Sequence, residues 1–368
     1  MYKKESFAEN LRFYRKKLGL TQQQLGNMVS YSGKAVSKWE SGNVFPPTEA
    51  LLRLTEILKT DLNALFALRE APSYFLGVDG GGTKTEFVLA DSDNNIIMQD
   101  TLGPCNAINM DSEEIEKVIT DGIKSVCRDV PPGQISAFFG ISGAGTQKSD
   151  RIYKFLKKFG FFSVGLGTDA QNIISAGLNG RNGIIAILGT GSVVFASKDG
   201  SLKRFGGYGN LLGDYASGYE IGKSGLSAVL AAADLSGPET LLSDMFSEKT
   251  KRNIFDVLPL FYKNGKSYIS SFTPMVFEAY RRGDGVARQI IRDNIKKFSC
   301  QLKAAAALFG GSEIPVVLSG GLTREAEVIL PLFKNELCDE KVKFEILREK
   351  PVMGAVRLAE KAGGDLND

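Results

Sequence analysis

The sequence contains no histidine, and this absence is the first limit on its chemistry. Without histidine the chain has no Ser-His-Asp triad and no histidine-ligated metal, so acid–base catalysis must fall to carboxylates, lysine or tyrosine. Cysteine is scarce as well, with four residues and no CxxC pair: Cys105, Cys127, Cys300 and Cys338. We expect these to be reduced thiols that mostly fill the core, not ligands of a metal or cluster.

Long apolar runs are also missing. No run approaches the roughly 20 residues needed to span a bilayer. The first residues, MYKKESFAENLRFYRKK, include no apolar stretch of the signal-peptide kind. These absences predict a cytoplasmic protein that does not contact a membrane. The length of 368 residues is enough for two or three domains with full cores.

Net charge is only +3 over the whole chain, but it is unevenly distributed. Residues 1–70 hold 11 Lys and Arg against 7 Asp and Glu, whereas the remainder holds 34 against 35. The positive excess therefore belongs to the N-terminal segment. A segment that meets a polyanion such as DNA is expected to carry such an excess.

Residues 6–66 have the pattern of a small all-helical unit, which we place at residues 1–70. Thr21, with Gln24 three residues later, predicts the start of a second helix through a capping box. Ser32 is a typical N-cap for a third helix. The short stretch LREAPS joins this unit to the rest of the chain.

The segment TQQQLGNMVSYSGKAVSKWESGNVFPPTEALLRLTEIL resembles the Cro/λ-repressor-type helix-turn-helix family over nearly its whole length. The resemblance implies that the third helix enters the DNA major groove with its N-terminal residues against base edges, while Val36 and Trp39 face the core. Lysines and small residues on its other face would meet the DNA. An alternative is a protein-docking helical domain with ordinary solvated lysines. The implied DNA-binding residues are Gln22, Ser32, Gly33, Lys34, Ser37, Lys38 and Asn43.

From Tyr74 onward the pattern changes to strands that alternate with helices, which is typical of an α/β chain. The plan of strand, glycine turn, strand and helices occurs twice. It predicts two similar lobes, 74–185 and 186–368, with a cleft between them. We expect strands at 75–79, 85–90, 95–101, 135–141, 163–168, 183–188, 193–197, 315–319 and 342–347. We expect helices at 112–127, 149–158, 170–178, 217–233, 272–282, 285–309, 323–336 and 352–362.

Two glycine-rich turns interrupt apolar strand-like runs, in FLGVDGGGTKTEFVLA and in GIIAILGTGSVVFA. Glycine lets backbone N–H groups approach a phosphate closely, because no Cβ blocks the way. Two such turns facing each other can hold a nucleotide triphosphate from both sides. Asp169 ends another apolar run, SVGLGTD, between the two turns. The arrangement favours phosphoryl transfer.

Residues 74–363 resemble the N-acetylglucosamine kinase and BadF/BadG ATPase family, within the superfamily of actin-like ATPases and sugar kinases. Three segments carry the resemblance: VDGGGTKTEFVLAD, ILGTGS and VVLSGG, in this order. The resemblance implies a two-lobed actin-like ATPase fold of the ribonuclease H-like type. It also implies ATP and Mg²⁺ as cofactors.

Nucleotide-binding roles follow from the three matched segments. Asp79 ends a strand and would direct its carboxylate at the phosphates, where Mg²⁺ is needed to neutralise charge. The residues expected to contact nucleotide are Asp79, Gly80, Gly81, Gly82, Thr83 and Lys84 in the first segment, Gly189, Thr190, Gly191 and Ser192 in the second, and Gly320 and Gly321 beside the adenosine.

In GTDAQN the resemblance implies that Asp169 is the base that accepts the proton of the sugar hydroxyl. A cap for the helix at 170–178 is the alternative, because aspartate suits that position as well. The sugar itself is expected beside Asn106, Ser142, Gly143, Asp169, Gly207, Tyr208, Gly209 and Asp214. Where the family usually reads GDEGSGYWIG, this chain reads GDYASGYEIG, so Tyr215, Ala216 and Glu220 depart from the pattern.

Three functions remain in competition at this point. The first is an ATP-dependent kinase of N-acetylglucosamine or a related amino sugar, fused to a sequence-specific DNA-binding domain. Such a protein would be a sugar-responsive transcription regulator that binds operator DNA as a homodimer. The second is a catalytically weak regulator that only senses sugar or nucleotide. The third, a dehydratase-activator ATPase with an iron–sulfur cluster, is disfavoured because no cysteine lies in ILGTGS or beside Asp169.

Overall fold

The computed structural model of the protein describes residues 4–66, 72–145 and 147–364. Its contacts divide the chain into two compact units. The first combines the residues up to Ser175 with those from Pro351 onward, and the second covers Ala176–Lys350. None of the helices in the described ranges is long and apolar enough to cross a membrane.

The N-terminal part of the first unit is all-helical, as predicted. Thr21 and Gln24 form the expected capping box at the start of the second helix, and Ser32 caps the third helix by accepting from the Ala35 N–H. Val36 and Trp39 are buried in the core of this part, as predicted. The helices are α1 (Lys4–Lys17), α2 (Gln22–Met28), α3 (Gly33–Glu40), α4 (Thr48–Leu58) and α5 (Leu62–Phe66).

A buried ion pair connects the helices of this part. Arg15 on α1 donates to both carboxylate oxygens of Glu40 at the end of α3, at 2.5 and 2.9 Å. The Glu40 side chain is 3% exposed and also accepts from Gln22 Nε2 at 2.9 Å. A charge buried this deeply needs such partners, so the pair fixes α3 against α1 and α2.

A five-stranded sheet forms the rest of the first unit. β1 runs antiparallel to β2 and parallel to β4, and β5 extends the parallel side. Helices α6 (Ser112–Cys127) and α7 (Ser149–Leu156) are amphipathic and share one apolar core with β1, β2 and β4. The strands, in spatial order, are β3 (Ile96–Leu102), β2 (Thr85–Asp91), β1 (Tyr74–Gly80), β4 (Ile135–Ile141) and β5 (Ser163–Gly167).

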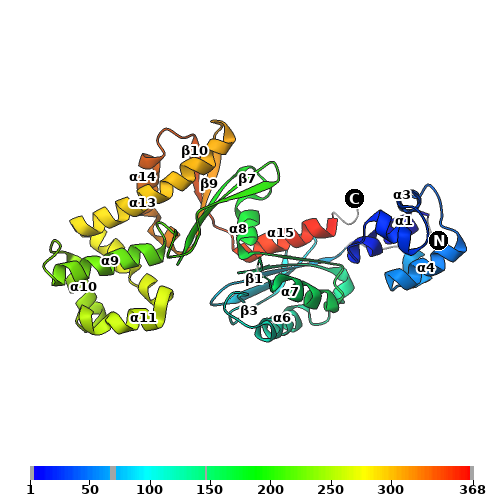
Figure 1. Cartoon of the computed structure of the whole chain (residues 1–368), viewed down its shortest axis with the longest axis horizontal. Helices are drawn as coiled ribbons and strands as arrows, with labels where there is room; N and C mark the ends of the chain where they lie inside the picture. Colours follow the sequence, from blue (N-terminus) through cyan, green and yellow to red (C-terminus); the bar gives the residue numbers. More distant parts are fainter. Residues whose placement is uncertain (1–3, 67–71, 146, 365–368) are drawn as a thin grey trace. The chain divides into compact units, whose positions relative to one another are not determined.

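The last helix of the chain, α15 (Pro351–Gly364), packs on the first sheet and not on the second. Val352 and Val356 of α15 share a core with Phe75 and Phe138 from β1 and β4. Figure 1 shows this helix in red along the sheet that contains β1. The compact units thus divide the chain differently from the predicted lobes, 74–185 and 186–368, because the first unit includes α15. The apolar face of α15 is buried against this sheet, which brings the end of the chain back to the first unit.

The second unit repeats the topology of the first sheet. In both sheets the first strand in the chain lies in the centre. On one side the next two strands continue the sheet through antiparallel pairings, and on the other side two strands add through parallel pairings. The predicted internal similarity is therefore confirmed. The strands, in spatial order, are β10 (Val342–Ile346), β9 (Ile314–Ser319), β6 (Gly183–Leu188), β7 (Ser192–Lys198) and β8 (Ser201–Phe205). The edge strand β8 was not predicted, because four of its five residues are exposed and its apolar pattern is weak.

The helices of the second unit include two that the sequence did not predict, α10 and α11. Pro259 lies inside α11, and a non-helical residue, Gly265, divides it, so the helical periodicity is interrupted. The helices are α9 (Gly218–Ala233), α10 (Leu241–Thr250), α11 (Ile254–Ser270), α12 (Thr273–Arg281), α13 (Gly285–Ala306) and α14 (Ala326–Glu336). α8 (Asp169–Leu178) contains the boundary between the two units.

Candidate nucleotide and sugar site

The candidate site in the first unit lies where parallel strands end. Asp79 of β1 is level with Gly140 of β4, which is level in turn with Gly167 of β5. Asp169 follows two residues later, at the start of α8. Ligands of open α/β sheets bind at this edge, outside the carboxyl ends of the strands.

Asp79 is a perturbed carboxylate at this edge. Its pKa is raised from 3.8 to about 6, mainly by burial and to a lesser extent by the charges of Asp169 and Glu86, against the opposing effects of a hydrogen bond from Asn172 and the charge of Lys84. The distance from Asn172 Nδ2 to Asp79 Oδ1 is 2.7 Å. A carboxylate held at such a cost is a candidate for a functional role.

Asn172 is a site residue that the sequence analysis missed. Its side chain is fully buried, and besides Asp79 its Nδ2 donates to the carbonyl of Val78 at 3.1 Å. Among the described residues its Oδ1 has no hydrogen-bond partner. The sequence could have indicated it, because Asn172 follows Asp169 by three residues and both side chains therefore lie on one face of α8.

Asp169 is half-buried, and burial raises the pKa of its carboxyl. The carboxylate accepts from the Ser142 hydroxyl and, at 3.0 Å, from the N–H of the next residue, Ala170. A capping side chain accepts from residues two or three positions further along, so this contact is not the usual cap. Gln171 instead reaches back to the Thr168 N–H, at 2.9 Å.

In the first unit, the amino acids that the sequence predicted to bind the sugar lie close to Asp169. Asn106 and Ser142 form an isolated parallel bridge, in which the Ala107 N–H donates to the Ser142 carbonyl at 2.8 Å. The Ser142 N–H donates to the carbonyl of Gly80 at 2.8 Å, and Gly143 packs against Ile108. The peptide segments around Asn106, Ser142 and the first glycine turn are therefore contiguous.

The first glycine turn joins β1 to β2. It is closed by a hydrogen bond from the Gly81 N–H to the Lys84 carbonyl at 3.0 Å, and Gly82 and Thr83 are exposed. The Lys84 side chain is 60% exposed and pairs with Glu86 at 2.9 Å. The turn thus presents its backbone and a cation to solvent beside Asp79.

The second glycine turn joins β6 to β7 and has the same topological position in its own sheet. The first residues of α9 hold it, because the Gly218 N–H donates to the Gly189 carbonyl at 2.8 Å and the Tyr219 N–H donates to that of Thr190 at 3.3 Å. Thr190 is exposed. Ser192 differs from the prediction, since it is buried and its hydroxyl donates to the Tyr215 carbonyl at 2.6 Å.

Asp214 is buried and has two partners. Its Oδ1 accepts from the Gly209 N–H at 3.2 Å, and its Oδ2 accepts from Lys266 Nζ at 2.9 Å. The departure from the family pattern at Ala216 has a structural consequence, since this fully buried alanine has a φ of +55°. A left-handed backbone there suits the glycine of the usual pattern better than alanine.

The other residues of the second unit that were predicted to bind nucleotide or sugar follow the ends of β8 and β9. Tyr208 is 65% exposed, with the Arg204 guanidinium over its ring at 5.2 Å. Gly207 packs on Val193, and the space that a side chain on residue 209 would occupy is open among the described residues. Gly320 lies against the backbone at the end of β6, whereas the space beside Gly321 is open.

The candidate DNA-binding helix, α3, exposes most of the predicted residues. Lys34, Ser37 and Lys38 are exposed on it, as is its cap, Ser32. Asn43 is also exposed, and its side chain donates to Ser41 at 2.8 Å. Two predicted residues face inward instead: Gly33 is buried against Gln23 of α2, and Gln22 donates to Glu40. Gly33 permits the close contact of α2 and α3 and is not on the exposed face.

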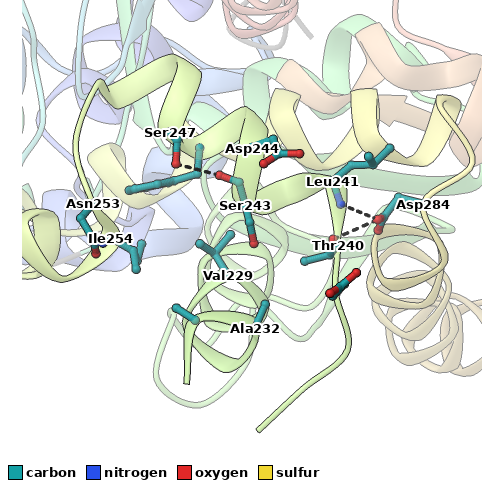
Figure 2. Close-up of a pocket in the computed structure, with 13 residues that line it drawn as sticks. Val229, Ala232, Thr240, Leu241, Ser243, Asp244, Ser247, Asn253, Ile254 and Asp284 are labelled. Carbon is teal, nitrogen blue, oxygen red and sulfur yellow. Dashed lines mark hydrogen bonds between the residues drawn. The ribbon is translucent and has the colours of Figure 1, made fainter. Parts of the chain in front are cut away.

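Within the described residues, no group of three or more His, Cys, Asp or Glu side chains is arranged to hold a metal ion. The second unit has a cavity of about 550 Å³ among α9, α10, the start of α11 and the segment before α13. Figure 2 shows its wall, where Asp284 accepts from the Thr240 hydroxyl and the Leu241 N–H. Asp284 also accepts from Ala287, so it joins the starts of α10 and α13, and none of the predicted site residues lines the cavity.

Two sheets of one topology, each with a glycine turn after its central first strand, form the two-lobed actin-like fold that the sequence predicted. The chain belongs to the BadF/BadG/BcrA/BcrD ATPase family, whose model matches residues 76–359. A helix-turn-helix domain model matches residues 8–70. The predicted combination of a BadF/BadG-type ATPase with an N-terminal helix-turn-helix domain is therefore confirmed.

Three known proteins illustrate the similarity. The N-acetylmuramic acid/N-acetylglucosamine kinase of Clostridium acetobutylicum is 29% identical over 301 residues, which cover 78% of this chain and 98% of the relative. A solved Chromobacterium violaceum structure, assigned as an N-acetylglucosamine kinase, has a TM-score of 0.66 at 24% identity and covers 78% of this chain and 99% of its own. A ROK family transcriptional regulator homologous to E. coli MLC has a TM-score of 0.55 at 12% identity, and the match covers 99% of this chain and 98% of that one.

Proposed function

We propose that this protein transfers the γ-phosphoryl group of ATP to a hydroxyl of N-acetylglucosamine or a closely related amino sugar. The observation that carries the proposal is the cluster at the end of the first sheet. There Asp169 accepts a hydrogen bond from Ser142, beside Asn106 and the first glycine turn. The names of the curated relatives support the choice of sugar.

In this mechanism Asp169 accepts the proton of the attacking sugar hydroxyl. Its raised pKa suits the task, because a base works best when its pKa approaches the working pH. The sugar oxygen forms a bond to the γ-phosphorus, the bond from that phosphorus to the β–γ bridging oxygen breaks, and ADP leaves. Ser142 holds the carboxylate of Asp169 in place through its hydroxyl.

Asp79 fits a magnesium-binding role of the kind that nucleotides require. Mg²⁺ is usually held by one or two carboxylates together with substrate phosphates and water, not by a cage of protein ligands. The Asp79 carboxyl is half-buried and its pKa is about 6, so a nearby cation would stabilise its charged form. When bound, the ion would neutralise charge on the β- and γ-phosphates.

For the second unit we infer nucleotide and sugar contacts. Thr190 and the backbone from Gly189 to Gly191 would meet phosphate, while Ser192 is left out because its hydroxyl is already used. Tyr208 offers an exposed aromatic face for the apolar side of a sugar ring. Asp214 offers a carboxylate for its hydroxyls.

The alternative is a regulator that binds the sugar without appreciable turnover. One observation favours it, namely the strained backbone of Ala216 in the segment that departs from the family pattern. A coupled ADP-release assay with N-acetylglucosamine, N-acetylmuramic acid, glucosamine, glucose and no sugar separates the two. We expect ADP release that depends on an N-acetylated amino sugar. Sugar binding without sugar-dependent ADP release would establish the sensor instead.

We further propose that the helix-turn-helix domain binds operator DNA, with α3 in the major groove. Replacing Lys34 and Lys38 together by Ala is expected to weaken binding and to lower the salt slope by about one unit for each lost phosphate contact. The probe is a fragment selected from random DNA by the protein itself, titrated by fluorescence. A matched double replacement of Lys117 and Lys124, exposed on α6, should have no effect. Unchanged binding by the α3 variant would contradict the assignment and point to a docking domain.

Sugar is expected to change the affinity for DNA, which would make the protein a sugar-responsive transcription regulator. Helix-turn-helix proteins commonly bind paired half-sites as dimers, so we infer a homodimer in the cytoplasm. We expect a coupling of about 1–3 kcal/mol, measured as operator affinity with and without saturating amino sugar and a non-hydrolysable ATP analogue. By linkage, DNA must change the sugar affinity by the same factor. Identical affinities in both titrations would show that the two activities are independent.

A further inference from the structure

Lys266 on α11 lies against the second glycine turn, although nothing in the sequence analysis singled it out. Its Nζ is 2.9 Å from Asp214 Oδ2. A Cβ placed on Gly191 would be 3.0 Å from Lys266 Nζ and 2.9 Å from Asp214 Oδ2. The ammonium and the carboxylate therefore lie beside the turn, where a side chain on residue 191 would displace them.

A special backbone conformation brings Lys266 to this position. Gly265, the preceding residue, has φ +62° and ψ −148°, which divides α11 into two helical segments. This region of backbone space is essentially restricted to glycine. Apart from its chain neighbours and the backbone of its own helix, no heavy atom among the described residues lies within 4 Å of a Cβ built on Gly265, so the conformation and not crowding favours glycine. The kink makes Lys266 the first residue of the second segment.

The exposure of the ion pair is unequal. The side chain of Asp214 is 5% exposed, but that of Lys266 is 34% exposed. An ammonium has three N–H donors. Within the described part of the chain, the Lys266 ammonium donates to Asp214 Oδ2. Neutralising a buried carboxylate uses one donor. The others remain accessible beside a turn whose backbone is suited to phosphate.

We propose that Lys266 is a phosphate-binding residue of the second unit, which donates to the terminal phosphates of ATP while it holds Asp214. The inference rests on the proposed function, because it takes the second turn to bind nucleotide. It extends the proposed function, because Lys266 would contact the nucleotide while it pairs with Asp214, the carboxylate that we assign to the sugar. A lysine ammonium is a compact point charge that suits phosphate oxygens.

The test compares ligands that differ in phosphate. We expect Lys266→Met to weaken binding of ATP and ADP by about 10- to 100-fold, the usual effect of losing a charge-assisted hydrogen bond. Binding of adenosine should be unchanged, because adenosine has no phosphate. The matched control is Lys263→Met, an exposed lysine three residues earlier on α11, which should bind all three ligands like the wild type. Calorimetry gives each affinity.

A second variant separates phosphate binding from the burial of Asp214. Lys266→Met alone leaves a buried carboxylate without its cation, which can unfold the second unit. Adding Asp214→Asn removes both charges, and under the proposal this double variant still binds ATP and ADP weakly and adenosine normally. Lys266→Arg keeps the charge and should recover most of the ATP affinity.

The outcomes distinguish the two proposals. Wild-type ATP affinity in the double variant would overturn the role of Lys266 and leave the kinase proposal standing. Equal losses for ATP and adenosine in both variants would assign Lys266 to structure alone and also overturn the inference. If the wild-type protein binds no ATP, the proposed function fails and this inference fails with it.

Discussion

Replacing Asp169 by Asn is expected to lower kcat by ~100-fold or more, with little change in the affinities for sugar and ATP. The neutral amide keeps the size of the carboxylate and can still accept from Ser142, but it cannot take the proton of the sugar hydroxyl. Steady-state kinetics with N-acetylglucosamine, together with calorimetry for each ligand, measure both effects.

The same substitution tests the competing role of Asp169 as a helix cap. Asparagine is as good an N-cap as aspartate, so a residue that only capped α8 would give near-normal turnover in the variant. Asp150→Asn, an exposed aspartate in the first turn of α7, is the control for loss of one charge. Wild-type kcat in the Asp169 variant would remove this residue from the chemistry.

Replacing Asp79 by Asn is expected to stabilise the ligand-free first unit at pH 7 by about 2–3 kcal/mol. The folded pKa is about 6, against 3.8 for the ordinary carboxyl, so the folded state retains its proton more strongly. As pH rises through this window, the unfolded chain releases its proton first, and the free energy of unfolding falls. The variant avoids this loss, and its advantage should disappear below about pH 4.

Urea unfolding followed at pH 4 and pH 7 measures the effect, and nucleotide binding provides the complementary observation. The stabilised Asp79 variant should bind ATP in the presence of Mg²⁺ more weakly than the wild type, because the carboxylate that would hold the cation is gone. A gain in stability with a loss of ligand affinity is the expected behaviour of a functional residue kept at a structural cost. Equal stability of variant and wild type at pH 7 would contradict it.

Local signals predicted much of the fold. The capping box at Thr21 and the cap at Ser32 form as expected, because they depend on residues three positions apart. The buried strands were also predicted, since both faces of β1 and β4 are covered and their sequences are almost continuously apolar. The edge strand β8 lacks such a pattern. The return of α15 to the first sheet depends on long-range packing, which no local window contains.

The candidate site was predicted less completely, because side-chain partners come from distant parts of the chain. The resemblance implied that Asp169 and Ser142 both lie near the sugar, and in the structure the Ser142 hydroxyl contacts the Asp169 carboxylate. The sequence did not indicate that Ser192 would turn inward to the Tyr215 carbonyl, 23 residues away. It also did not indicate Lys266, which reaches Asp214 across 52 residues through the kink at Gly265.

The most direct test of the central claim is mass spectrometry of N-acetylglucosamine after incubation with the full-length protein, ATP and Mg²⁺. The account predicts a phosphorylated sugar, formed in step with ADP by the wild type and nearly absent with Asp169→Asn. ADP that appears without any phosphorylated sugar, or equal product from wild type and variant, would contradict the account.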